Sequence, residues 1–508
     1  MIQQSVGGVA KLALTIAVAL VTLAELIGDG TIGLLAGILA FLLCIVAMFS
    51  MPMRSSILGL TFLVLTLPNP SEGTPTLRGP PFSYTGQAFM THLNTLSENR
   101  EGLLGLFPVS CLEMFFALLF ITHLMRKGAN VPEGRTAASP EPLFKLAYIS
   151  LATTALDWMR GLVTGGNFAM SLWQVNVVLY LPLLFLLMHV SLRGPEDHAA
   201  LARVFVWAAV YKSFLAVYVI LTAEMPLDPV THVMRTPDYA TAHSDSMLFA
   251  VATIIVLAQL LERFDRRSLK LALLVTPILF AGMVANNRRI VWVQIGVVGL
   301  IVFVISRASH FKKRVVRTVI ALIPVLAIYV AAGWDSQYGK FYKPVRLVRS
   351  IIDAQSDRTG SSMWREFENF NLVSTYRYHP ILGTGYGHRY LEFITMPGVD
   401  YSLEFYSPHN SILGLWAFSG LIGFAGVTLL WVAGTYFAMR AYRNARDPDH
   451  RVAAIVCFGA LPIYLLQSWG DLGLGSWTGV FMMSASICVS GKLAVALGEW
   501  RPSTFRQG

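Results

Sequence analysis

Residues 271–306 read LALLVTPILFAGMVANNRRIVWVQIGVVGLIVFVIS. Two apolar runs, each close to the length that crosses a bilayer as a helix, are separated only by Asn286, Asn287, Arg288 and Arg289. Placing a guanidinium near the hydrocarbon core is costly unless it is paired or reaches water. The stretch therefore predicts two membrane helices with a short connection, whose arginines need a structural or functional partner.

The rest of the chain repeats this apolar pattern. Of its 508 residues, 55% are hydrophobic and 13% are charged, about half the charged fraction of a soluble protein. The long runs exclude the alternating strands of an outer-membrane barrel and predict helices, which satisfy their own backbone hydrogen bonds. The fold class is an all-α polytopic membrane protein with about 14 (12–14) transmembrane helices. The predicted spans are 9–28, 31–49, 55–68, 107–124, 143–164, 169–190, 200–222, 246–262, 270–285, 290–306, 316–333, 418–439, 452–470 and 476–496.

Basic residues cluster in short loops between these spans. If every span crosses once, four clusters lie on one side, which the positive-inside rule assigns to the cytoplasm. Both termini are then cytoplasmic, and the net charge of +10 requires no nucleic-acid partner. The clusters are Arg126, Lys127 and Arg135; Arg263, Arg266, Arg267 and Lys270; Arg307, Lys312, Lys313, Arg314 and Arg317; and Arg440, Arg443, Arg446 and Arg451.

The four cysteines lie in or beside apolar runs. Cys44, Cys111, Cys457 and Cys488 lack the spacing of metal ligands. We interpret them as small core residues, not as a disulfide framework.

Three longer segments lie on the outer side, at 69–106, 223–245 and 334–407. The last contains Trp334 and many tyrosines, and a connection of this length is usually functional. We expect it to form short helices over the outer face. The chain then divides into helices 1–11 over 1–333, with the 69–106 loop, a periplasmic loop above the candidate site over 334–407, and the last helices over 408–508.

Arg288 and Arg289 are suited to holding a phosphate group. A guanidinium can form two parallel hydrogen bonds to phosphate oxygens. The alternative is that both arginines extend from helix ends to the membrane interface. The pair alone does not decide between these interpretations.

Ser407-Pro408-His409-Asn410 precedes an apolar helix. Ser407 is suited to the N-cap and Pro408 to the first helical position, which would place His409 in the first turn. The positive end of the helix dipole disfavours protonated imidazole there, and neutral imidazole can act as a general base. The alternative is an interfacial histidine that hydrogen bonds a backbone carbonyl.

The 334–407 loop carries two further candidate arginines. Arg358 lies in an Asp-Arg-Thr-Gly sequence, and Arg365 lies in a Trp-Arg pair. Arg365 can equally pair with Glu366 or Glu368 on a solvated helix.

A glycine-rich turn follows at 379–387, beginning with His379-Pro380. Its G-x-G-x-G spacing is that of a phosphate loop, but it lacks the preceding strand and following helix. We therefore predict no nucleotide site there.

The motifs occur in a characteristic order: a membrane arginine, a large outer loop with Trp-Arg, the His-Pro-x-x-Gly-x-Gly-x-Gly turn, and a His-Asn pair opening a helix. This set resembles the O-antigen ligase and O-antigen polymerase superfamily of bacterial inner membranes, most closely over 280–425. The family's arginine motif usually reads Ser-Arg-small. Asn-Asn-Arg-Arg-Ile here leaves both Arg288 and Arg289 as candidates.

The resemblance implies a metal-independent, inverting glycosyltransferase without a cofactor. His409 matches the catalytic histidine that activates an acceptor hydroxyl. Arg288 or Arg289, together with Arg365, matches the arginines that contact the pyrophosphate of an undecaprenyl-linked glycan. We assign supporting roles to Arg358, Asn410 and His379. The implied partners are this lipid-linked glycan, the bilayer, a flippase and a chain-length regulator, and the implied location is the bacterial inner membrane with the active site facing the periplasm.

Three functions remain open at this point. The first is a polymerase that joins repeat units of an exopolysaccharide or O-antigen, and the second is a ligase that transfers the glycan to lipid A core or protein. The third is a transporter or flippase, which would suit Asp157, Arg160, Lys145 and Lys212 within spans. A transporter predicts inverted repeats, which the sequence does not show. We favour the polymerase, and we interpret Asp157 and Arg160 as a structural pair.

Overall fold

The computed structural model describes residues 2–27, 30–67, 89–90, 109–129, 137–222, 240–336, 342, 345, 349, 361–395 and 405–502. Within these ranges every regular element is a helix. The N-terminal helices are α1 (Ile2–Ile27), α2 (Gly30–Ser50), α3 (Met53–Thr66), α6 (Cys111–Gly128), α7 (Glu141–Val163), α8 (Phe168–Ser191), η2 (Pro195–Asp197) and α9 (His198–Thr222). The remaining helices are α10 (Asp245–Glu262), α11 (Arg266–Asn286), α12 (Arg289–Ile305), α13 (His310–Gly333), α15 (Ser361–Tyr378), α16 (Ser411–Asn444), α17 (Pro448–Gly470), η4 (Gly473–Gly475) and α18 (Trp477–Ala496).

The predicted all-α membrane class is confirmed, and each predicted span coincides with a helix. Seven helices of the described residues are long and apolar enough to cross a membrane, and the bent α8 would be an eighth. The helices α1, α2, α3 and α12 contain shorter apolar segments. The count of about 14 spans is therefore not confirmed.

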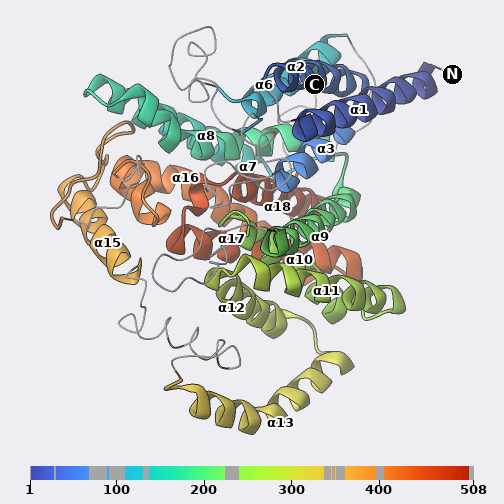
Figure 1. The fold of residues 1–508 in the computed structure, drawn as a ribbon, viewed down its shortest axis with the longest axis vertical. Coiled ribbons are helices and arrows are strands. Elements are labelled where there is room, and N and C mark those ends of the chain that lie inside the picture. The colour runs from blue at the N-terminus through green and yellow to red at the C-terminus, as the bar shows by residue number, and fades with distance from the viewer. Residues whose placement is uncertain are drawn as a thin grey trace.

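The helices pack around α16, α17 and α18 (Figure 1). On one side α7 and α8 pack against α16 and α18, and on the other α10 packs against α17 and joins α9, α11 and α12. The central position of α18 is reflected in its burial, since 83% of its apolar 18-residue stretch is buried in the protein. In contrast, α13 lies apart from the bundle, and 0% of its apolar 18-residue stretch is buried.

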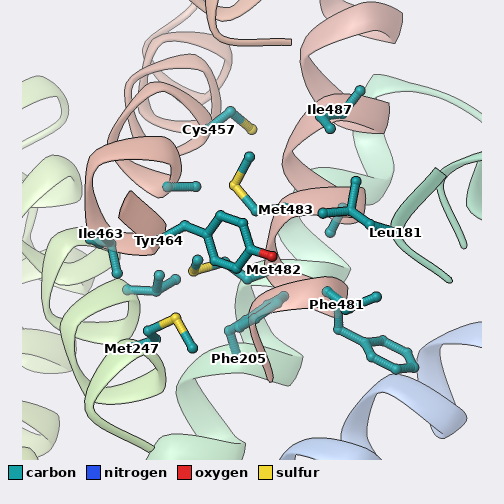
Figure 2. Close-up of a cluster of buried hydrophobic side chains, with 14 of the residues drawn as sticks. Leu181, Phe205, Met247, Cys457, Ile463, Tyr464, Phe481, Met482, Met483 and Ile487 are labelled. Carbon is teal, nitrogen blue, oxygen red and sulfur yellow. The ribbon is translucent and has the colours of Figure 1, made fainter. Parts of the chain in front are cut away.

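Large apolar side chains fill the space between the central helices (Figure 2). The ring of Tyr464 on α17 lies among Met247, Met482 and Met483 and is fully buried. Cys457 and Cys488 are free and buried in the same core, as predicted. Interdigitated packing of this kind holds membrane helices together, because lipid supplies little hydrophobic driving force.

Three of the four basic clusters meet at one end of the bundle. Glu262, at the end of α10, accepts hydrogen bonds from Arg451 Nε at 2.7 Å and from the Tyr442 hydroxyl at 2.6 Å. Arg307 donates to the backbone carbonyl of Ala445 at 3.3 Å. The ends of α10, α12 and α16 and the start of α17 therefore lie together, as alternating crossings require.

A break in α16 shapes the opposite end. Gly420 has φ 61° and ψ −167°, which interrupts the helix. The N–H groups of Thr384 and Gly385 donate to the carbonyls of Ala417 and Phe418 at 3.0 and 2.8 Å. The 379–387 turn thus pairs with the backbone groups that the break leaves open, which gives this glycine-rich sequence a structural role.

Candidate active site

Chemically active side chains gather at the end of the bundle opposite the basic clusters. They come from five places: the start of α15, the segment before α16, the segment before α10, the α11–α12 connection and the turn after α17. These places are far apart in the sequence, so the site depends on the packing of the whole bundle.

His409 is held by Glu368 on α15. The fully buried Glu368 carboxylate accepts hydrogen bonds from the His409 backbone N–H at 3.0 and 3.1 Å, and one carboxylate oxygen lies 3.4 Å from His409 Nδ1. The Trp364 ring meets the imidazole edge to face, with ring centroids 4.8 Å apart. A carboxylate at Nδ1 favours the tautomer with its proton on Nδ1, in which Nε2 carries the lone pair and can act as a base.

Asn410, not Ser407, caps the following helix. The Asn410 side chain accepts from Leu413 N at 3.1 Å and donates to Asn369 Oδ1 at 2.9 Å. The prediction of a Ser407 cap with His409 in the first turn is therefore wrong, because α16 begins only at Ser411. The N–H groups of His409 and Asn410 are taken up by Glu368, so His409 lies just before the helix.

The Asn-Asn-Arg-Arg sequence divides into separate roles. Asn286 is fully buried, and its side chain accepts from the Thr241 backbone and hydroxyl at 3.3 and 3.1 Å. Asn287 ends α11 with φ 55°, a left-handed conformation that Asn tolerates well. Arg288 precedes α12 and hydrogen bonds to His243 Nε2. Arg289 is the first residue of α12 and is partly buried. Arg288 thus contacts the gathered side chains through His243.

His243 links Arg288 to Asp471. Its Nδ1 is paired with an Asp471 carboxylate oxygen, while Nε2 faces the Arg288 guanidinium. An arginine can only donate, so Nε2 accepts and the ring proton lies on Nδ1, toward Asp471. Gln467 supports the group by donating to the carbonyls of His243 and Asp471, each at 3.3 Å.

Asp471 lies within the electrostatic reach of the other candidates. Burial alone would raise its pKa, but the hydrogen bond and charge of His243, with the charges of Arg365 and His409, outweigh burial and hold the pKa below its usual 3.8. Asp471 is 5% exposed, and its Oδ1 has no hydrogen-bond partner among the described residues. The carboxylate therefore stands charged between the histidines and arginines of the site.

The alternative pairing of Arg365 with its neighbours on α15 is not observed. Glu368 turns to His409, and no ion pair joins Arg365 to Glu366 or Glu368 in this described helix. Arg365 is partly buried and acts on Asp471 through its charge.

The remaining predicted site residues do not join this group. His379 lies beyond the far end of α15, eleven residues or about 16 Å along the helix axis from Glu368. It is exposed, and its backbone closes the turn onto Gly383 at 2.9 Å. Arg358 lies outside the described residues.

The four charged residues that suited a transporter have protein partners. Lys212 Nζ contacts Asp245 at 3.1 Å, and both side chains are almost fully buried. Arg160 lies 3.8 Å from Asp157 and donates to the Gly383 carbonyl at 3.1 Å, which confirms the predicted structural pair. Lys145 pairs with Glu141 one turn away at 2.8 Å.

Three contributors were not identified from the sequence. His243 and Asp471 lie 228 residues apart, and His409 and Glu368 lie 41 apart. The only sequence signal for His243 and Asp471 is position, since each lies beside the end of a membrane helix, whereas Glu368 lies within α15. Among the described residues, no three His, Cys, Asp or Glu side chains are grouped to hold a metal ion.

Comparison with known proteins points to the same region. The family model described as O-Antigen ligase matches residues 274–428, from α11 into α16, a range that includes Arg288, Arg365 and His409. The match covers slightly less than a third of the chain, and no curated protein matches it. The match over this range supports the predicted resemblance to the O-antigen ligase and O-antigen polymerase superfamily.

Proposed function

We propose that the protein is an inverting glycosyltransferase of the bacterial inner membrane that uses an undecaprenyl-pyrophosphate-linked oligosaccharide as donor. Of the two candidate reactions, we favour the joining of repeat units into an exopolysaccharide or O-antigen. The observation that carries the proposal is that the buried Glu368 carboxylate holds the imidazole of His409. The charges of His409 and Arg365 both act on the carboxylate of Asp471, which places the three residues in one site.

The first step is activation of a sugar hydroxyl. Glu368 fixes the Nδ1 side of His409, so Nε2 accepts the hydroxyl proton. The hydroxyl oxygen forms the new bond to the anomeric carbon of the donor as the bond from that carbon to the pyrophosphate oxygen breaks. A positioned base contributes roughly 10²–10⁴-fold to such a step. Attack from the face opposite the leaving group inverts the anomeric centre.

The second requirement is to stabilise the leaving pyrophosphate. Arg288 and Arg365 would provide guanidinium groups for its developing charge. Before the donor binds, Arg288 hydrogen bonds to His243 and the charge of Arg365 interacts with Asp471. These interactions lower the free-energy cost of placing arginines near the membrane. Binding of the pyrophosphate would replace part of this internal pairing. The family resemblance implies that no metal is needed.

The proposed orientation follows from the two ends of the bundle. The Arg307, Arg451 and Tyr442 cluster marks the cytoplasmic end under the positive-inside rule. His409 and Arg288 are then periplasmic. We propose the same division of the chain as above, with 334–407 covering the site, both termini cytoplasmic, and a flippase and a chain-length regulator as functional partners.

A deletion strain tests the proposal and separates it from the ligase alternative. Loss of a polymerase leaves single repeat units on the lipid carrier, whereas loss of a ligase leaves long lipid-linked chains without their acceptor. Restoration by the wild-type gene and not by His409→Ala supports glycosyl transfer. Normal lipid-linked intermediates and normal surface glycan in the deletion strain would contradict it.

A further inference from the structure

A cavity lies directly behind the segment that carries His409. Its empty volume, including the open mouth, is about 420 Å³, and it is bounded by α8, the first turns of α16, the 406–408 segment and the turn at η4. Pro408 and Ser411 line it, whereas His409 and Asn410, between them, do not. The cavity is therefore lined by residues on both sides of His409 and Asn410 in the sequence, but not by these two residues.

Four aromatic residues belong to the cavity wall. Trp173 and Tyr406 are half-buried, and Tyr386 and Phe418 are almost fully buried. The exposed Gly475 lies at the rim, where a side chain would meet no neighbour. A ligand that enters from outside can thus meet the half-buried rings of Trp173 and Tyr406.

The polar groups of the wall are neutral. Ser407 and Ser411 line the cavity, and none of the described residues that line it is charged. A pyrophosphate would require cationic donors, and the described lining residues provide none. A sugar ring presents an apolar C–H face and a rim of hydroxyls, which matches aromatic rings combined with serine hydroxyls.

The wall is held in place before any ligand binds. The Gln174 amide donates to the carbonyls of His388 and Tyr406 at 3.0 and 2.9 Å and accepts from Gly387 N at 2.5 Å. The Arg389 guanidinium lies over the Tyr406 ring, 5.4 Å from its centroid. A wall fixed in this way reduces the ordering cost of binding.

We propose that this cavity binds one pyranose ring of the glycan, the ring adjacent to the one that reacts at His409. This inference rests on the proposed function and adds a specificity site to it. The bound ring is not the reacting one, because His409 does not line the cavity. A glycan crossing the 407–411 segment would place its next ring beside the imidazole, so the cavity selects the sugar next to the new linkage.

The test uses the purified full-length chain in detergent. The probes are the oligosaccharide repeat unit of the source strain, released from its lipid, and the same unit on its lipid carrier. Trp173→Ala is expected to raise KM for one probe by about tenfold or more, with kcat within about threefold. A rise for the free unit assigns the cavity to the acceptor glycan, and a rise for the lipid-linked unit assigns it to the donor glycan.

Two variants keep the test independent of folding and of catalysis. Trp173→Phe retains a ring and should keep most of the affinity, whereas Trp207→Ala removes an exposed tryptophan of α9 and should change neither KM. His409→Ala should lose transfer yet bind the repeat unit with wild-type affinity. Equal KM values for Trp173→Ala and wild type with both probes would overturn the sugar site. A wild-type protein that binds the unit but transfers nothing would instead contradict the proposed function.

Discussion

The buried carboxylate of Glu368 accepts the backbone N–H of His409 at 3.0 Å and lies 3.4 Å from Nδ1 of the same residue. One acidic side chain thus fixes both the position of the segment and the orientation of its imidazole. Two contacts to a single buried group make the geometry of His409 depend on α15, which lies in the long connection between α13 and α16.

Replacing Glu368 by Gln should lower kcat by about 10²–10⁴-fold, since the amide can donate to Nδ1 and place the ring proton on Nε2. Rates of glycan transfer by the purified variant measure the loss. The control is Glu366→Gln, an exposed neighbour on the same helix, and equal losses in the two variants would contradict the assignment.

Replacing Arg288 by Lys should reduce kcat/KM for the lipid-linked donor by about 10–100-fold. Lysine keeps the charge but lacks the planar fork that holds two phosphate oxygens. Arg289→Lys is expected to cause a smaller loss, because the guanidinium of Arg288 hydrogen bonds to His243. The comparison requires donor titration of both variants, and a larger loss for Arg289→Lys would transfer the pyrophosphate role to that residue.

Asp471→Asn should lower the thermal midpoint of the purified protein, because His243 and the arginines lose their buried counter-charge. The pKa of Asp471 is lowered in the folded protein, so its stabilisation is fully present above the usual value of 3.8 and is lost as pH falls through the lowered pKa. The midpoint difference should therefore stay constant between pH 5 and 8. A difference that disappears within this range would show that the carboxylate is neutral there.

Gly420→Ala should reduce the amount of folded protein in the membrane. The residue has φ 61°, and an added Cβ would overlap the backbone of Ile381 and Gly383. The backbone strain at this φ and the steric overlap would both prevent the 379–387 turn from packing against the break in α16. Size-exclusion chromatography of detergent extracts measures the loss, with Gly296→Ala as the control because a Cβ there meets no neighbour within 4 Å. Equal yields of the two variants would show that the break tolerates a side chain.

Hydrophobic patterning predicted the helices well, because each apolar run satisfies its own backbone and must lie in lipid or core. The pair of Asp157 and Arg160 was also predictable, since residues three apart share a helix face. Contacts between residues that are far apart in the sequence could not be predicted in this way. Glu368 and Arg365 occupy one helix, so local spacing suggested that they pair, whereas the tertiary contact with His409 takes the carboxylate.

The N-cap of α16 and the break at Gly420 could not be predicted from hydrophobic periodicity, because both depend on hydrogen bonds to residues elsewhere in the fold. Ser407 and Asn410 are both good N-caps, and Asn410 prevails because Glu368 takes up the N–H groups of residues 409 and 410. The break at Gly420 lies within a continuous apolar run and depends on the 379–387 turn for its hydrogen bonds. Asp471 and His243 come together only when α10 and α17 pack.

The most direct test of the central claim is transfer by the purified protein, using the strain's own undecaprenyl-pyrophosphate-linked repeat unit as donor and acceptor. The wild-type protein should form joined glycan and release one undecaprenyl pyrophosphate for each bond made. A folded His409→Ala variant should be slower by about 10²-fold or more while still binding the donor. Joined glycan formed by His409→Ala at the wild-type rate would contradict the claim that His409 is the base of a glycosyl transfer.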